Sequence, residues 1–380
     1  MKWAKTNEIK LDPLAYNLAL IGESGIGKTT IIKEYCEKLA GKDKYIFLNF
    51  GKEDGSDAID GIRYLNCWDW DADFDEDTYS VGFNTFVEDV VENRSTDWKD
   101  LRVVVIDTYD ELFSIAEPEV IGMHNRENPN KKVKSIKAAF GGFQGGEDKA
   151  IEIVLDRLWA LKRVGVSFII IGHTKTRNIT DPVTGEDYMQ LTTNMPQKYF
   201  NAIKTKVHFL GVASIDREIV KQKTGKKNIA TGEEIRKGVV KGETRRITFR
   251  DNNFVIDSKS RFSQIEESIS FDADSLIHAV TDAIKKEQSK SGISIESALE
   301  KQCKEHEEFL EKMAKRELQT KSEKELNVVL DQIMQYLTNN KSDIDGIVKP
   351  ILQKCREMGY NSPKEISNIE DARTILDMCK

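Results

Sequence analysis

The hydrophobic residues of the first 215 positions form short, continuously apolar runs that alternate with longer runs of helical periodicity. Continuous apolar runs are typical of strands buried on both faces, as in a parallel sheet between layers of helices. The pattern therefore predicts an α/β fold with a mostly parallel, twisted sheet between helices. The expected strands lie near 17–21, 45–50, 102–107, 167–172 and 206–213, and the clearest helices near 28–39, 79–93 and 149–164.

Two long polar stretches interrupt this alternation. The first runs from Glu117 to Asp148 and holds four lysines between Lys131 and Lys137, followed by GGFQGG; the second runs from Lys175 to Lys198. Loops of this length inside a compact domain are usually functional or disordered. From Glu218 to Phe254, turn residues separate two runs of strand-like pattern, which predicts an antiparallel hairpin that extends the sheet.

The composition changes at about residue 265, where helix-forming residues and cap signals begin to dominate. We expect one domain over 1–265 and an all-helical C-terminal extension over 266–380. Ser322 with Glu325 has capping-box spacing and predicts a helix start, while Gly359 predicts a helix end.

Charge and hydropathy narrow the class of protein. The net charge is −7, so any nucleic-acid contact must come from local basic patches. No apolar run approaches the roughly 20 residues needed to cross a bilayer, and the N-terminus lacks the apolar core of a secretory signal. We expect a cytoplasmic protein without membrane contact. The five cysteines are scattered without a CxxC pair, which argues against a zinc site and a disulfide framework.

The segment GESGIGKT, from Gly22 to Thr29, has the spacing of a phosphate-binding loop and lies between an expected strand and an expected helix. That context disfavours a glycine-rich turn that binds nothing. Its glycines allow backbone N–H groups to turn toward a phosphate, Lys28 would reach the β and γ phosphates, and Thr29 would hold Mg²⁺. We expect ATP and Mg²⁺ as cofactors. The binding residues would be Gly22, Glu23, Ser24, Gly25, Ile26, Gly27, Lys28, Thr29 and Thr30.

Two acids are candidates for the remaining chemistry. Asp107 ends the apolar run RVVVID and, with Thr29, would bind the metal ion. Hydrolysis also needs a carboxylate that orients the attacking water, but the next residue is Thr108, and the nearest acids, Asp110 and Glu111, lie past the end of the strand. The end of the neighbouring strand is the other place from which a carboxylate can reach the γ-phosphate. Glu53, after the second strand, is the candidate base; the alternative is an ordinary loop acid beside Lys52, one of two adjacent acids with Asp54.

His173 ends the fourth apolar strand, SFIIIGH. The carboxyl ends of parallel strands meet at one edge of a sheet, so this ring would lie beside the γ-phosphate and sense hydrolysis. The alternative is a structural hydrogen-bonding role. The expected catalytic residues are thus Glu53, Lys28 and His173.

In this order, GESGIGKTT, the acid after the second strand, VVVIDTYDEL and IIIGHTKTR resemble the RecA-like ATPase core over about residues 15–262. They are most similar to compact phage and prophage ATP-binding proteins of the AAA family that act as single-strand annealing recombinases. The resemblance implies the core strand order 5-1-4-3-2, ATP-dependent homo-oligomers, single-stranded DNA binding and a single-strand binding protein as partner. It gives the residues named above the roles of phosphate loop, catalytic acid, metal-binding acid and sensor.

The resemblance also indicates where DNA and a neighbouring subunit would bind. The two DNA-facing loops of RecA correspond to the insertion with Lys131–Lys137 and to the stretch Lys175–Arg177. Phe140 and Phe143 add stacking platforms to the first, although a solvated charge run remains the alternative. RecA-like assemblies usually complete the site with a basic residue from the adjacent subunit. The candidates are Lys241, Arg245, Arg246 and Arg250, with an exposed hairpin of alternating cations as the alternative.

We therefore expect an ATP-hydrolysing ATPase that acts on single-stranded DNA in recombination or replication, in the bacterial host cytoplasm if it is phage-encoded. One alternative is a ring helicase or helicase-loading ATPase with the same core. Another is a nucleotide-dependent scaffold or switch that hydrolyses slowly and binds proteins through its helical tail.

Overall fold

The computed structural model describes residues 7–51, 55–181, 184–227, 234–250, 256–290 and 292–379. The chain forms two compact units. The first consists of Met1–Val91 with Trp98–Lys304, and the second of Glu92–Asp97 with Glu305–Lys380. The domain boundary expected at residue 265 falls inside the first unit, because the helix that follows it packs into the core of the sheet domain.

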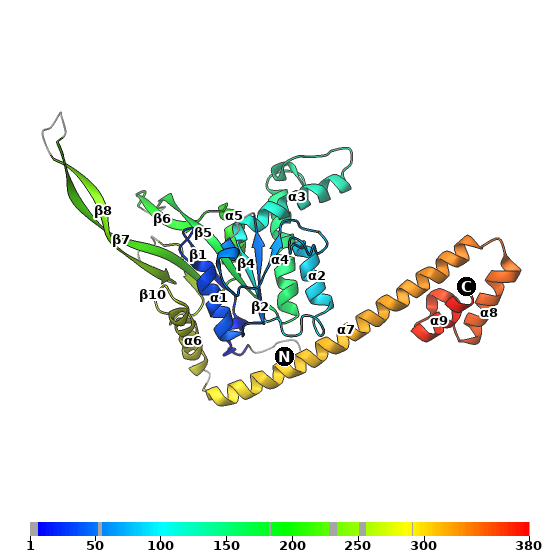
Figure 1. Cartoon of the computed structure of the whole chain (residues 1–380). Helices are drawn as coiled ribbons and strands as arrows, with labels where there is room; N and C mark the ends of the chain where they lie inside the picture. Colours follow the sequence, from blue (N-terminus) through cyan, green and yellow to red (C-terminus); the bar gives the residue numbers. More distant parts are fainter. Residues whose placement is uncertain are drawn as a thin grey trace. The chain divides into compact units, whose positions relative to one another are not determined.

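The first unit is built on a parallel sheet (Figure 1). Its five expected strands pair in the order β7-β1-β5-β4-β2, which is the order 5-1-4-3-2 along the chain and confirms that expectation. A short strand, β3, adds a parallel edge beyond β2 that the sequence analysis did not anticipate. The strands are β1 (Leu18–Gly22), β2 (Tyr45–Phe50), β3 (Tyr64–Cys67), β4 (Val103–Asp107), β5 (Ser167–Thr180) and β7 (Phe209–Lys227).

Helices cover both faces of this sheet, which explains its continuously apolar strands. Leu20 and Phe47 point to the face covered by α1 (Lys28–Leu39) and α6 (Ala273–Ser289), where they share one buried cluster. On the opposite face, Phe50 contacts Phe83 and Phe168 contacts Trp159. The helices of that face are α2 (Phe83–Glu92), α3 (Tyr109–Glu127), α4 (Gly145–Arg163) and α5 (Gln197–Lys204).

The two stretches expected to be loops are largely ordered secondary structure, which corrects that expectation. Helix α3 continues to Glu127 because Leu112, Ala116, Val120 and His124 recur every fourth residue and are all buried. Only the part between α3 and α4 is irregular, apart from a short turn at Ile136–Ala138.

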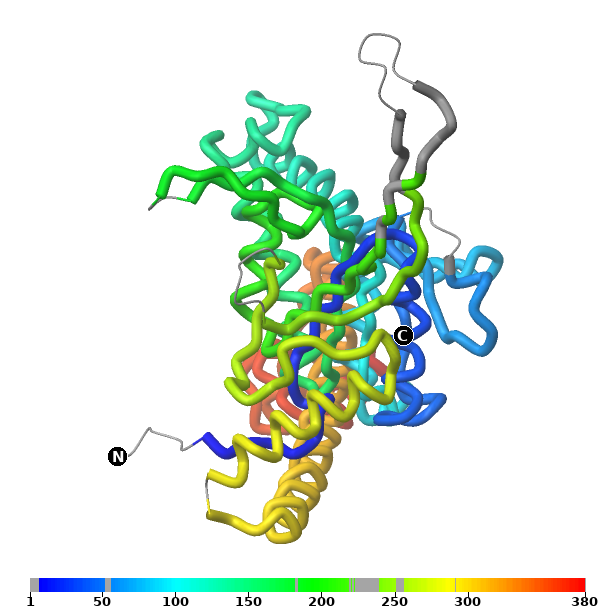
Figure 2. The backbone as a smooth tube through the Cα atoms, turned by 90° about the vertical axis from the view of Figure 1, so that its left-hand side faces the viewer, coloured from blue at the N-terminus to red at the C-terminus, as the bar shows by residue number. Residues whose placement is uncertain are grey.

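The second stretch is also extended rather than irregular. Strand β5 continues to Thr180 and pairs in antiparallel fashion with β6 (Asp187–Thr193). The expected hairpin is confirmed: β8 (Glu234–Thr248) pairs with β7, and the two strands run side by side beyond the sheet in Figures 1 and 2. Two short strands, β9 (Lys259–Ser260) and β10 (Ser268–Ser270), complete the edge.

The second unit is helical. Helix α7 (Ile295–Asn339) begins in the first unit and continues into the second, so the helix start predicted at Ser322 is wrong. It is followed by a π-helical turn at Ile344–Val348, α8 (Lys349–Glu357) and α9 (Ile369–Asp377).

The core of the second unit contains Ile333, Ile351 and Ile375. Gly359, at φ +90°, follows the end of α8, as the sequence predicts. None of the helices in the described ranges has the length and hydropathy needed to span a membrane.

His208 joins the start of β7 to the segment before β1. The backbone N–H of Asn17 donates to His208 Nδ1 at 3.1 Å, and the backbone N–H of His208 donates to the Asn17 carbonyl at 2.9 Å. Burial, followed by the charge of Lys162, lowers the pKa of His208 from 6.5 to about 4. Nδ1 must stay unprotonated to accept its bond, so the fold favours the neutral ring.

We expect this histidine to make the free energy of unfolding rise with pH between about 4 and 6.5. In that window the unfolded chain binds a proton that the folded chain does not, so the contribution is complete above the window and lost below it. His208→Gln keeps an acceptor for Asn17 and should flatten this part of the profile. Urea unfolding of both proteins at about pH 5 and about pH 7.5 measures the difference. If the free energy of unfolding changes equally with pH in both proteins, His208 is not the source of the pH dependence.

Candidate functional site

The phosphate-binding loop lies between β1 and α1, as the motif requires. Gly25 has φ +74° and Gly27 has φ +107°, a conformation that side chains other than glycine rarely adopt. A Cβ on Gly22 would lie 2.8 Å from the Cβ of Ala213, so the close approach of β7 also requires glycine there. The buried Lys28 donates through Nζ to the carbonyls of Gly22 at 3.1 Å and Glu23 at 2.9 Å.

The two residues expected to hold a metal ion meet directly. Thr29 Oγ1, in the first turn of α1, donates to Asp107 Oδ2, at the end of β4, at 2.8 Å. They are 78 residues apart in the chain and are brought together because β1 and β4 end at the same edge of the sheet. A hydroxyl and a carboxylate oxygen are the kind of ligands that Mg²⁺ takes from proteins.

His173 lies at the same edge and is paired with an acid. It is opposite Gly22 in the register of β1 and β5, and its Nδ1 lies 2.8 Å from Asp110 Oδ2, near the start of α3. Burial alone would raise the pKa of Asp110, but the hydrogen bond and charge of His173 bring it below the ordinary 3.8. An ionised carboxylate only accepts, so His173 Nδ1 carries the proton.

The end of β2 contributes a buried polar residue that the sequence analysis missed. Asn49 lies opposite Asp107 in the sheet register, and its side-chain oxygen accepts a hydrogen bond from Ser56 at 3.0 Å. An asparagine within an apolar strand was the available signal. The candidate base, Glu53, lies in the loop after this strand and outside the described residues, so its role stays a prediction.

The hairpin cations lie in different surroundings. Arg245 Nη1 donates to the carbonyl of Ile26, in the phosphate loop of its own chain, at 3.1 Å. Arg246 pairs with Asp216 at 3.0 Å. Arg250 donates to the Ser263 carbonyl at 2.5 Å, and Lys241 is exposed.

The insertion is anchored by residues of α3 that the sequence analysis did not single out. His124 Nδ1 accepts the backbone N–H of Phe140 at 3.2 Å, and Asn125 Oδ1 accepts that of Val133 at 2.7 Å. These bonds hold the lysine segment and the glycine loop that follows it. In the glycine loop, Phe143 has a positive φ of 46° and is fully exposed. The four lysines of Lys131–Lys137 are also exposed.

The stretch Lys175–Arg177 divides into an exposed and a structural residue. Lys175 is exposed on β5. Arg177 is half-buried and donates through Nη2 to the carbonyls of Thr193 at 3.2 Å and Met195 at 2.5 Å. Arg177 therefore fixes the end of β6, and Lys175 is the exposed cation of this stretch.

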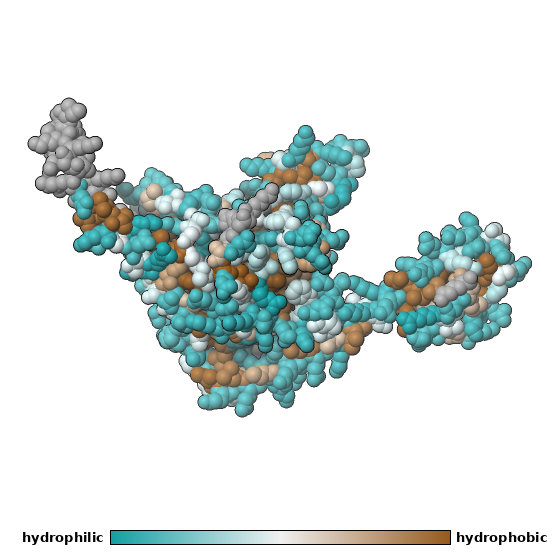
Figure 3. All heavy atoms as spheres, viewed as in Figure 1, coloured by the Kyte–Doolittle hydropathy of each residue, from teal (hydrophilic) through white to brown (hydrophobic). Residues whose placement is uncertain are grey.

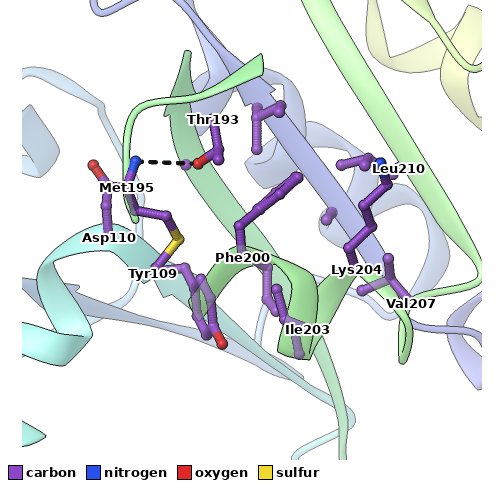
Figure 4. Close-up of a pocket in the computed structure, with 13 residues that line it drawn as sticks. Tyr109, Asp110, Thr193, Met195, Phe200, Ile203, Lys204, Val207 and Leu210 are labelled. Atoms are coloured by element: carbon purple, nitrogen blue, oxygen red, sulfur yellow. Dashed lines mark hydrogen bonds between the residues drawn. The ribbon is translucent and has the colours of Figure 1, made fainter. Parts of the chain in front are cut away.

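A small cavity lies on the face of the sheet opposite α1 (Figure 4). Its wall is mostly apolar and includes Tyr109, Met195 and Phe200, with Asp110 at its edge. A triphosphate buried in such an apolar lining would lose its hydrogen bonds to water without gaining replacements from the protein. The cavity is a packing feature behind the phosphate loop.

Comparison with known proteins identifies the family. The model of a family described as an AAA domain matches residues 14–262. The chain belongs to this AAA domain family. Together with the phosphate loop and the strand order, this makes the protein a nucleotide-binding ATPase with a RecA-like P-loop fold.

A search of the curated proteins finds no match to this AAA domain protein. Solved structures similar to it include a KaiC-like protein from the hyperthermophilic archaeon Pyrococcus horikoshii, at 14% sequence identity and a TM-score of 0.34. That match covers 70% of this chain and 96% of the KaiC-like chain.

The pairing of Asp110 with His173 should stabilise the fold at neutral pH. Asp110→Asn keeps the shape and removes the charge, and we expect it to lower the free energy of unfolding by about 1–2 kcal/mol near pH 7. The carboxylate contribution is complete above the ordinary pKa of 3.8 and is lost as pH falls through the lower folded value. The difference between variant and wild type should therefore shrink in acid. Urea unfolding of both proteins near pH 7 and in acid, below pH 3.8, measures this difference in the free energy of unfolding.

Asp216→Asn is the matched control, because Asp216 pairs with Arg246 but its side chain is 57% exposed. It should cost at most about 0.5 kcal/mol. Equal losses in the two variants would contradict a special contribution from the His173 pair.

Proposed function

We propose that this protein is a Mg²⁺-dependent ATPase that hydrolyses ATP while acting on single-stranded DNA in recombination or replication. The observation that carries the ATPase part is the hydrogen bond between Thr29 and Asp107 at the mouth of a glycine-built phosphate loop. The DNA part is supported by the anchored insertion that exposes Phe143 beside lysines.

The residues present suit ATP and Mg²⁺. The loop from Gly22 to Thr29 would bind the phosphates through its N–H groups, and Lys28 would move from its two carbonyl partners to phosphate oxygens. Thr29 and Asp107 would hold the metal ion, which neutralises charge on the phosphates when bound.

Hydrolysis needs a base and a group that responds to the γ-phosphate. Glu53 is the proposed base, because the end of β2 adjoins Asp107 in the sheet. His173 is the proposed sensor: Asp110 fixes its protonated Nδ1, so the ring keeps one orientation at the edge of the loop.

Single-stranded DNA would bind along the insertion. Lysines between Lys131 and Lys137 would contact phosphates, and Phe143 would stack on a base. In Figure 3 the end of this insertion, at the upper right, presents a mostly hydrophilic surface with apolar side chains among it. Lys175 is a second candidate contact. Homo-oligomers and a single-strand binding protein are the proposed protein partners.

Lys28→Ala should abolish ATP turnover, because it removes the cation that reaches the transferred phosphate. Glu53→Gln should keep nucleotide binding and stop hydrolysis. Phosphate release and binding of a fluorescent ATP analogue, measured on the same samples, separate the two effects. Wild-type turnover in Glu53→Gln would remove that residue from the proposal, and wild-type turnover in Lys28→Ala would reject the site itself.

Phe143→Ala should weaken binding of a fluorescent single-stranded oligonucleotide about tenfold, since one stacked base contributes about 1–3 kcal/mol. Phe74→Ala is the matched control, because Phe74 is 51% exposed in the acidic segment after β3. It should bind the oligonucleotide as the wild type does. Equal losses in both variants would contradict a specific platform.

Two further measurements decide between the functional classes. Stimulation of turnover by single-stranded DNA supports the proposal, and strand displacement on a forked duplex would indicate a helicase. Absence of binding at low salt, with turnover unaffected by DNA, would favour a nucleotide-dependent scaffold.

A further inference from the structure

The base of the β7–β8 hairpin lies against the outside of the phosphate loop of the same chain. Arg217 Nη2, on β7, lies 3.2 Å from Glu23 Oε2, and Arg245 Nη1, on β8, donates to the Ile26 carbonyl at 3.1 Å. Ile215 pairs with Arg245 in the strand register. Since residues two apart share a face of a strand, Ile215, Arg217 and Arg245 lie on one face, which is turned toward the loop.

The bond from Arg245 fixes the direction of one peptide group. The Ile26–Gly27 peptide is not among the cis bonds of the described residues, and in a trans peptide the C=O and N–H point in opposite directions. A carbonyl of Ile26 held toward the hairpin therefore directs the N–H of Gly27 away from the hairpin. In a phosphate-binding loop, a phosphate accepts hydrogen bonds from N–H groups turned to the concave side, so the Gly27 N–H is a candidate donor.

Gly27 makes this peptide easy to turn and hence in need of support. Its φ of +107° shows a conformation open to glycine, whose backbone rotates more freely than that of any other residue. The buried side chain of Ile26 anchors the residue before the peptide, and a Cβ on Gly27 would lie 3.4 Å from the ring of Phe271. Arg245 adds a polar contact to the Ile26 carbonyl from the hairpin.

We propose that Arg245 is a positioning residue that acts in cis: it holds the Ile26 carbonyl outward so that the Gly27 N–H faces the phosphates of the nucleotide. This assigns it a different role from a finger reaching into the site of a neighbouring subunit. The inference rests on the proposed function only in that the loop binds ATP; it does not depend on DNA.

The first test is nucleotide affinity. Arg245→Ala should weaken binding of fluorescent mant-ATP about tenfold, the effect of losing about 1.4 kcal/mol. Because Arg245 acts within its own chain, the loss should be the same at every protein concentration. Arg245→Lys, which can still donate, should recover part of the loss. Arg261→Ala is the matched control, because Arg261 also donates to a backbone carbonyl of this unit, that of Thr205. Neither residue belongs to the phosphate loop or to the hairpin. This control should bind mant-ATP within about twofold of wild type.

Thermal unfolding of each variant checks that the protein is folded. Should Arg245→Ala be unfolded, Arg245→Met carries the test, because methionine keeps much of the side-chain length but cannot donate to the Ile26 carbonyl. Wild-type mant-ATP affinity in a folded Arg245→Met would overturn the proposal. Wild-type affinity in a folded Arg245→Ala would overturn the proposal.

The second test separates cis from trans action. Arg245→Ala protein is mixed with Lys28→Ala protein, and ATP turnover is measured against each alone. If Arg245 acted in trans, turnover would be restored at interfaces where the intact phosphate loop of the first variant meets the intact Arg245 of the second. A cis role predicts no recovery, because each subunit then carries a damaged loop of its own; recovery of turnover would overturn the proposal. If wild-type turnover is absent altogether, the proposed function fails, while the mant-ATP comparison still decides the role of Arg245.

Discussion

The common edge at which the parallel strands end is the constraint on which the site depends. Because β1, β4 and β5 run in one direction and are neighbours, Gly22, Asp107 and His173 arrive at one edge although they come from distant parts of the chain. The hydrogen bond from Thr29 to Asp107 then ties the first turn of α1 to β4 across the intervening β5. A change in strand order would separate these groups whatever their sequence motifs.

Packing on both faces keeps that edge in place. The central strands are mostly apolar because helices cover the sheet on each side, and a slip in register would move polar ends such as Asp107 into the core. Two buried polar groups near the edge are paired, Asn49 with Ser56 and His173 with Asp110, whereas Thr108 Oγ1, Asp110 Oδ1 and Thr174 Oγ1 are buried without a hydrogen-bond partner among the described residues. Asp107 and His173 are therefore positioned by strands, and Thr29 by the first turn of α1.

The sequence predicted those parts of the fold that local pattern determines. The phosphate loop, the strand ending in Asp107 and the β7–β8 hairpin each carry a short-range signal, and the structure contains them. The strand order came with the resemblance. Helix α3 was missed because Pro118 and polar residues concealed a buried face that recurs every fourth residue. Ser322 failed as a helix start because capping-box spacing also occurs by chance in a long charged helix.

The site was predicted as separate residues rather than as contacts. Asp110 and His173 are 63 residues apart, and Arg245 lies 219 residues from the carbonyl it contacts. No local pattern encodes such pairings, since they arise only when the sheet has formed. The charge of Arg245 suggests a contact with a neighbouring subunit, whereas the antiparallel pairing of β8 with β7 brings it to the phosphate loop of its own chain.

Strand β5 has a mechanical consequence. It passes without interruption from the sheet, past His173, into the ribbon that it forms with β6 up to Thr180. Because the strand is continuous, a rotation of its backbone at His173 would tilt the ribbon that follows. Seven residues at about 3.3 Å each make a lever of roughly 23 Å, and a tilt of about 5° would displace its tip by about 2 Å. A small tilt of β5 beside the nucleotide would in this way reach the exposed end of the ribbon at Thr180 and Asp187.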